Sequence, residues 1–283
     1  MANQINFDRA SQLYLQGERS STCFAQVLTN RLALTQPDEY RRAVEELLRF
    51  GQTRIGQLEI AVPPTLGVSG IQEYARRNKI DFHSALLTLS IAEAINGDCK
   101  LKVDLDSGTV ASVLDNSTKF TGGKAEWIEW GANMMFGRQK LNAFRHEDAY
   151  IWKQNFLSGK LNKQPLSLWV HGETSRHILL VDYVQNGRVY FKDSFKADIG
   201  YFKDLFGEAA RKEGFNTWSV DLDTLLNSGK IAYTICDQNI FPYHRTLSVA
   251  ESIPLDDFVP ILMFLQNARS YLNTDDKRKR NKV

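Results

Sequence analysis

The sequence predicts an α+β fold in which a helical N-terminal half packs on an antiparallel sheet, and three observations predict it. Before Pro165 most segments repeat their apolar residues every three or four positions, as helices with one buried face do. After Pro165 come short segments rich in β-branched and aromatic residues, and Asn186-Gly187 forms a strong hairpin turn between two of them. Helices followed by strands are typical of an α+β protein.

Amphipathic spacing and end signals predict the helices. In residues 20–34 the apolar side chains share one helical face behind Ser and Thr residues that favour a helix start. The next helix begins at Pro37 and ends at Gly51, a favoured first residue and a favoured stop. Further helices are expected at residues 69–79, 82–95, 125–136, 147–157, 202–211 and 255–272.

Strands are predicted from alternation and from composition. Residues 100–105 alternate as a half-buried strand, and a turn at Asp106-Ser107-Gly108 leads into residues 109–114, so the two segments should form a hairpin. The strands of the C-terminal half are expected at residues 166–170, 178–184, 188–191 and 231–236.

The composition is that of an ordinary soluble globular protein, with 43% hydrophobic and 24% charged residues in a chain of 283. A formal net charge of +2 gives no support for a nucleic-acid binder. The basic run at residues 277–282 is predicted to be a solvated tail, with contact to an anionic partner as the alternative. We expect one domain at residues 1–272, with an insertion around residues 97–145, and a basic flexible tail at residues 273–283.

Cysteine use and the first residues bear on the compartment. Three cysteines do not make a disulfide framework and leave at least one thiol free, which favours a reducing compartment. The N-terminus lacks the basic start and apolar run of a classical secretory signal, and no stretch approaches the roughly 18 apolar residues of a membrane span. Signals of specialised secretion systems are polar, so delivery by such a system stays open.

Cys23 is the candidate nucleophile because it stands at the start of the first predicted helix. The helix N-terminus favours a thiolate over a thiol, which a structural cysteine does not need. His177 heads an apolar strand and Asp193 ends the next one, so a hairpin between them would place both at its open end. There the carboxylate would orient the imidazole toward the thiol. The order Cys, His, Asp is that of a papain-like thiol hydrolase.

Other cysteines and histidines are rivals for these roles. Cys99 lies in a turn that enters a strand without a helix behind it, and Cys236 ends an apolar strand and is expected in the core. His171, in Val170-His171-Gly172, is the rival base. No comparable acidic partner accompanies the three remaining histidines, which are His83, His146 and His244.

An oxyanion hole would need hydrogen-bond donors beside the thiol. The backbone N–H of Cys23 is one, and Gln16 is the candidate side-chain donor, with Gln12 as its competitor. No paired Cys-x-x-Cys, His-Glu-x-x-His or phosphate-loop motif is present, so neither a metal nor a cofactor is expected. Trp127 and Trp130, three residues apart on one face of a predicted helix, are expected to serve packing rather than to form a platform for a ligand.

At these residues the chain resembles the YopT/AvrPphB family of papain-fold bacterial effector proteases, and more loosely the related glutamine deamidases. The resemblance rests on Cys23 at a helix start, His177 at a strand start, and the segment Phe191-Lys192-Asp193-Ser194-Phe195-Lys196, which is similar to the Phe-Asp-Pro-Asn-Phe-Gly segment of that family. Lys192, Ser194 and Lys196 depart from that segment, and the interval from Cys to His is longer than the family suggests.

The resemblance implies a papain-like fold, a cysteine protease that cleaves a protein of a host cell, and delivery into the host cytosol by a specialised secretion system. The bacterial cytoplasm is the alternative location. Glutamine deamidase, transglutaminase and a non-catalytic binding or scaffold protein are the alternative functions. The resemblance covers two short places in the chain and does not identify the substrate.

Overall fold

The computed structural model describes residues 22–96, 99–104, 109–114, 120–121, 125–137, 141–145, 153, 157, 166–171, 176–193, 203, 205–214 and 217–237. The chain divides into two compact units, Met1–His244 and Arg245–Val283, and every described residue lies in the first. Within this unit the fold is α+β, with helices packed on antiparallel sheets.

The helices begin and end where local chemistry favours it. The Asp81 side chain caps one of them by accepting a hydrogen bond from the backbone N–H of Ser84 at 2.7 Å. Another begins at Pro37, and Gly51 ends it in a left-handed conformation. In the described part the helices are α1 (Cys23–Thr35), α2 (Pro37–Phe50), α3 (Gly67–Asn78), α4 (Phe82–Ile95), α5 (Ala125–Phe136) and α8 (Leu222–Asn227).

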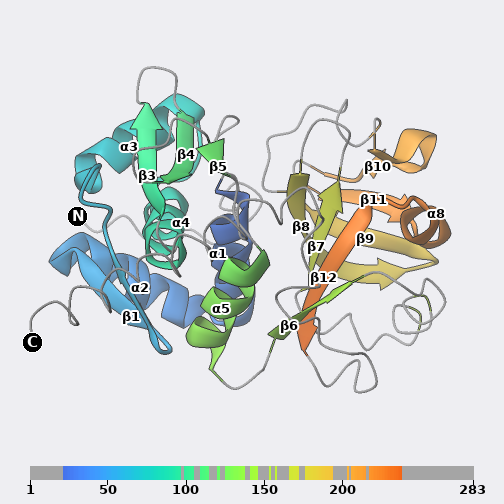
Figure 1. Ribbon diagram of the computed structural model, residues 1–283, viewed down its shortest axis with the longest axis horizontal. Coiled ribbons are helices and arrows are strands. Elements are labelled where there is room, and N and C mark those ends of the chain that lie inside the picture. The colour runs from blue at the N-terminus through green and yellow to red at the C-terminus, as the bar shows by residue number, and fades with distance from the viewer. Residues whose placement is uncertain are drawn as a thin grey trace, which may run out of the picture. The chain divides into compact units, whose positions relative to one another are not determined.

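The strands form three antiparallel sheets, of which the largest has seven strands (Figure 1). Its order is β10 (Arg211–Lys212), β11 (Thr217–Asp221), β9 (Arg188–Lys192), β8 (Arg176–Gln185), β7 (Leu166–His171), β12 (Ile231–Asp237) and β6 (Leu141–Arg145). The smaller sheets are β1 (Gln52–Ile55) with β2 (Leu58–Ala61), and β3 (Cys99–Asp104) with β4 (Thr109–Leu114) and β5 (Phe120–Thr121).

The hairpin of β8 and β9 turns at Asn186 and Gly187, as the sequence predicts. Their φ angles are 50° and 71°, the left-handed values that a tight two-residue hairpin loop requires. Gln185 pairs with Arg188 next to the turn, and the register shifts between Val181 and Tyr183. This shift leaves Asp182 as the extra residue of a β-bulge, which sets the register at the open end of the hairpin.

Helix α1 is the central element of the helical half. Every residue from Phe24 to Ala33 is buried, and the helix packs against α2, α4, α5 and β8. A helix in such a position is apolar on most of its surface rather than on one stripe. The sequence pattern described one buried face, whereas the structure buries the whole circumference.

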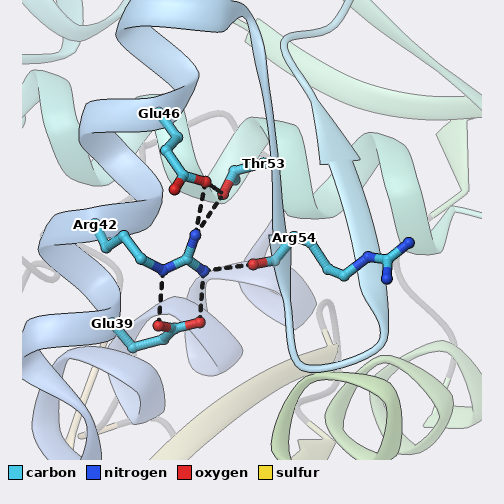
Figure 2. A network of polar contacts seen from close by, with 5 residues as sticks. All are labelled: Glu39, Arg42, Glu46, Thr53 and Arg54. Atoms are coloured by element: carbon cyan, nitrogen blue, oxygen red, sulfur yellow. Dashed lines mark hydrogen bonds and ion pairs between the residues drawn. The ribbon is translucent and has the colours of Figure 1, made fainter.

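Polar contacts centred on the Arg42 guanidinium connect the hairpin of β1 and β2 to α2 (Figure 2). Arg42 holds Glu39 through two hydrogen bonds of 2.9 and 2.6 Å and Glu46 through one of 2.6 Å, and it also donates to the carbonyl oxygen of Arg54 at 2.5 Å. Thr53 donates to the same Glu46 carboxylate at 2.5 Å, which is the first cause of a lowered pKa at Glu46. These contacts fix the strand relative to the helix that precedes it.

The tip of the β1–β2 hairpin contacts the C-terminal end of α5. The backbone N–H of Gln57 donates to the carbonyl oxygen of Met134 at 2.7 Å. At Gly56, where φ is +57°, a Cβ atom would lie 2.3 Å from the carbonyl oxygen of Met135. Glycine is therefore required here both for its backbone conformation and for the close approach.

Most of the predicted elements that fall on described residues are confirmed. Four predicted helices match α1 to α4, a fifth matches α5, and the predicted strands match β3, β4, β7, β8, β9 and β12 to within about two residues. The helix expected at residues 202–211 is wrong at its C-terminal end. Gly207, at φ +58°, begins a 3-10 turn at Gly207–Ala209, and Arg211 already belongs to β10.

Some elements were not indicated by sequence patterns. These are β1, β2, β5, β6, β10, β11 and α8. Trp127 packs on Phe24, with ring centroids 5.7 Å apart, as predicted, whereas Trp130 is 49% exposed. Most of the predicted helix at residues 147–157, the helix at residues 255–272 and the tail at residues 273–283 lie outside the described residues.

Candidate active site

His177 and Asp193 meet at the open end of the β8–β9 hairpin. Leu180 pairs with Lys192, so Asp193, the next residue, comes opposite the part of β8 that leads back to His177. Nε2 of His177 lies 2.5 Å from Oδ1 of Asp193, and neither side chain is exposed to solvent. The structure therefore brings these two predicted residues together.

Cys23 reaches the same place from the helical half of the unit. It is the first residue of α1, its thiol is free and partly exposed, and α1 packs against β8. Cys23 lies close enough to His177 to contribute to the raised pKa of the ring. Asp193 engages Nε2, so Nδ1 is the ring nitrogen left for the thiol. All three residues singled out in the sequence thus form one chain of contacts.

The ring of His177 holds its proton more firmly than an ordinary histidine. Burial lowers the pKa, because a charged ring is costly in the interior. The charge of Asp193 and its hydrogen bond outweigh burial, Cys23 adds a further hydrogen bond and charge, and together they raise the pKa of His177 to about 9. At neutral pH the site favours an imidazolium ring between two anion-forming groups.

The start of α1 supplies donors as well as the thiol. Thr22 precedes the helix without a side-chain capping bond, and its carbonyl oxygen accepts from the N–H groups of Ala25 and Gln26. The N–H groups of the first residues of a helix have no partner within the helix and point out of its N-terminus. The N–H of Cys23 is therefore placed to face negative charge that develops on a group bound at the thiol.

The proposed side-chain donors of an oxyanion hole remain predictions. Gln16 and its competitor Gln12 lie outside the described residues. The rival nucleophiles and the rival base are placed by their backbone alone. Cys99 begins β3, Cys236 lies in β12, and His171 ends β7 opposite Arg176.

The remaining histidines do not form a second site of the same kind among the described residues. His83 lies next to the start of α4, with Nδ1 4.0 Å from Oδ2 of Asp81 and both side chains partly exposed. That distance is longer than a hydrogen bond. His146 and His244 lie outside the described residues.

A buried polar cluster next to Cys23 was not indicated by the sequence pattern. The amide of Gln26 donates to Oδ1 of Asn30 at 2.9 Å and to Oγ of Ser84 at 3.2 Å, and it accepts from the hydroxyl of Thr88 at 3.1 Å. Thr88 also lies 3.0 Å from the hydroxyl of Thr29. The sequence signal for this cluster is the spacing of its polar residues. Thr29 and Asn30 lie three and four residues after Gln26 on α1, and Thr88 lies four residues after Ser84 on α4, which places each set on one face of a largely apolar helix.

The part of the chain that the structure describes contains neither a metal-binding cluster nor a membrane-spanning helix. No group of three or more His, Cys, Asp or Glu side chains there is arranged to hold a metal ion. None of the helices in the described ranges has the length and apolar character needed to cross a membrane.

Comparison of the chain with protein-family models, with curated protein sequences and with solved structures found no significant match. Function is therefore inferred from the geometry of Cys23, His177 and Asp193.

Proposed function

We propose that this protein is a cysteine hydrolase that acts on a protein substrate through Cys23, His177 and Asp193. Cys23 is the nucleophile, His177 the general base and acid, and Asp193 the group that orients the ring. The observation that carries the proposal is the fully buried imidazole of His177, held by Asp193 at 2.5 Å on Nε2, with Cys23 close enough to raise the pKa of the ring. Burying a charged ring between these groups is costly for a purely structural histidine.

Each step uses a group already in place. The Cys23 thiolate attacks the carbonyl carbon of an amide, and the oxygen takes up negative charge at the N-terminus of α1. The His177 imidazolium then donates its proton to the leaving nitrogen, which departs as an amine and leaves a thioester on Cys23. Neutral His177 next takes a proton from water as the water attacks the thioester, which releases a carboxylic acid and the thiol.

The leaving nitrogen and the acceptor distinguish a protease from a deamidase and from a transglutaminase. A backbone nitrogen gives peptide-bond cleavage, and a glutamine side-chain nitrogen gives deamidation. An amine in place of water gives a transglutaminase. We propose cleavage of a peptide bond as the principal activity because the spacing of His177 and Asp193 resembles that of the protease family more closely.

The arrangement of the elements supports a papain-like fold. A central helix that begins with Cys23 packs on an antiparallel sheet, in which His177 lies in β8 and Asp193 directly follows the neighbouring strand β9. Delivery to a host cell stays a prediction of the family resemblance.

Proteolysis and its alternatives are separated by one experiment with a matched variant. The wild-type protein and Cys23→Ala are each incubated with a eukaryotic cell lysate, and new peptide N-termini, ammonia release and deamidated glutamines are measured by mass spectrometry and an ammonia assay. We expect new N-termini with the wild type alone. Ammonia and deamidated glutamine without new N-termini would identify the deamidase instead. Identical products from both proteins would contradict a catalytic Cys23.

A further inference from the structure

The polar cluster beside the nucleophile joins two helices by their side chains alone. Gln26 uses both of its N–H donors and its carbonyl oxygen, and the contacts reach Ser84 and Thr88 on α4. Ser84 is itself fixed, because its backbone N–H donates to the capping carboxylate of Asp81. The network thus ties the first two turns of α1 to the first two turns of α4.

A buried hydrogen-bond network lowers stability unless each of its polar groups has a hydrogen-bond partner. Gln26, Ser84 and Thr88 are 1%, 0% and 2% exposed, so water does not replace a lost partner. Any rotation of α1 about its axis, or any slide along it, breaks several of these hydrogen bonds together. Apolar packing selects one rotation of α1 less strongly, because the helix is buried on all sides and apolar contacts are non-directional.

The rotation of α1 decides where the thiol points. Cys23 lies three residues before Gln26, on the same side of the helix, and its partner His177 belongs to β8 rather than to α4. A rotation of about 20° moves a Cα atom by roughly 0.8 Å on a cylinder of about 2.3 Å radius. A displacement of about 1 Å in a catalytic group costs on the order of 100-fold in rate.

We propose that Gln26 is a positioning residue, whose hydrogen bonds to Ser84 and Thr88 set the rotation of α1 and thereby direct the Cys23 thiol at His177. The inference rests on the proposed function, since it concerns the same thiol. It gives the buried polar cluster a role beyond stability. The hydrogen bonds of the Gln26 side chain go to Asn30, Ser84 and Thr88 rather than to Cys23 or His177, so its effect on the thiol is indirect.

The rate of alkylation of the Cys23 thiol tests the positioning role of Gln26 without a substrate. The rate at which iodoacetamide modifies Cys23 is measured from pH 5 to 10, with the modified cysteine identified by mass spectrometry and folding confirmed by thermal melting. Gln26→Met keeps the length and volume of the side chain but removes the amide, and Thr88→Val removes the hydroxyl. We expect Cys23 in the wild type to react rapidly at pH 6, and about 10- to 100-fold more slowly in Gln26→Met. Its profile should become that of an ordinary thiol, which gains reactivity above about pH 8.

The double variant Gln26→Met/Thr88→Val separates positioning from stability. Gln26→Met alone leaves the buried Thr88 hydroxyl without its Gln26 acceptor, and the double variant removes that hydroxyl, although Asn30 and Ser84 lose the Gln26 donor in both variants. We expect it to melt closer to the wild type than Gln26→Met does, while Cys23 stays slow at pH 6. Val27→Ala, next to Gln26 and 3% exposed, is the control that loses packing but keeps the network, so its thiol should keep the wild-type profile.

Each outcome decides between the two proposals. A wild-type profile in folded Gln26→Met, or in the double variant, would overturn the positioning role. If Gln26→Met does not fold, an unchanged profile in Thr88→Val would overturn it. A wild-type thiol that is no faster at pH 6 than an ordinary cysteine would instead count against the proposed function.

Discussion

Nε2 of His177 lies 2.5 Å from Oδ1 of Asp193, and the side chains of both residues are fully shielded from solvent. His177 lies in β8 and Asp193 directly follows β9, so the contact is set by the register of these two strands. The third residue, Cys23, lies on helix α1, which packs against β8 but is far from the hairpin in the sequence. The predictions below follow from these contacts and from the packing that holds them.

Stability should fall as the pH rises from about 6.5 to about 9. The pKa of His177 is raised from 6.5 to about 9, so the folded protein binds a proton in this range that the unfolded chain releases. The stabilisation is complete below pH 6.5 and lost above pH 9, with a magnitude on the order of 3 kcal/mol. Urea unfolding at intervals from pH 6 to 10 measures it. In Asp193→Asn the decrease should be much smaller, and an equal decrease in both proteins would assign it to other groups.

Asp193→Asn should fold and yet lose activity. The amide has nearly the shape of the carboxylate, but it removes the charge that stabilises the imidazolium and does not specify the same ring tautomer. We expect a decrease in kcat of about 10- to 10⁴-fold, as in triads of this kind. Turnover of a cleaved substrate and thermal melting measure the two effects. Unchanged turnover would remove Asp193 from the mechanism.

Cys23→Ala should abolish activity at little cost in stability. The thiol is partly exposed at the first position of α1, so its removal leaves no closed cavity, and the loss should be about 1 kcal/mol or less. Phe24→Ala is the matched control. Phe24 is 0% exposed and packs on Trp127, and its removal should cost about 3–5 kcal/mol. A large loss of stability in Cys23→Ala, with activity retained, would make Cys23 a structural residue.

Gly56→Ala should destabilise the protein more than Gly51→Ala. Both glycines have positive φ angles, +57° and +73°, so each substitution pays the same backbone strain of about 1–2 kcal/mol. A Cβ atom at Gly51 meets nothing within 4 Å, whereas one at Gly56 lies 2.3 Å from the Met135 carbonyl oxygen. The hairpin tip would have to leave α5, which should add roughly 1–3 kcal/mol. Urea unfolding of the two variants measures the difference, and equal losses would show that the tip moves freely.

The elements that form from neighbouring residues were predictable from local sequence signals. The helices α2, α4 and α5 follow from apolar spacing and end signals such as Pro37 and Gly51. The β8–β9 hairpin follows from Asn186-Gly187, because few residue pairs adopt two left-handed conformations in a row. With that hairpin, the closeness of His177 and Asp193 was predictable from the count of residues on its two arms.

Features that depend on contacts between distant segments become visible only in the folded protein. Strands β6 and β11 have no strong pattern of their own, and the pairing of β12 with both β7 and β6 joins segments far apart in the chain. The same holds for the choice of Nε2 for Asp193, and for the contacts of Gln26 with Ser84 and Thr88. A polar residue on a buried helix is specified by its partners on another helix, and the periodicity of one segment carries no information about them.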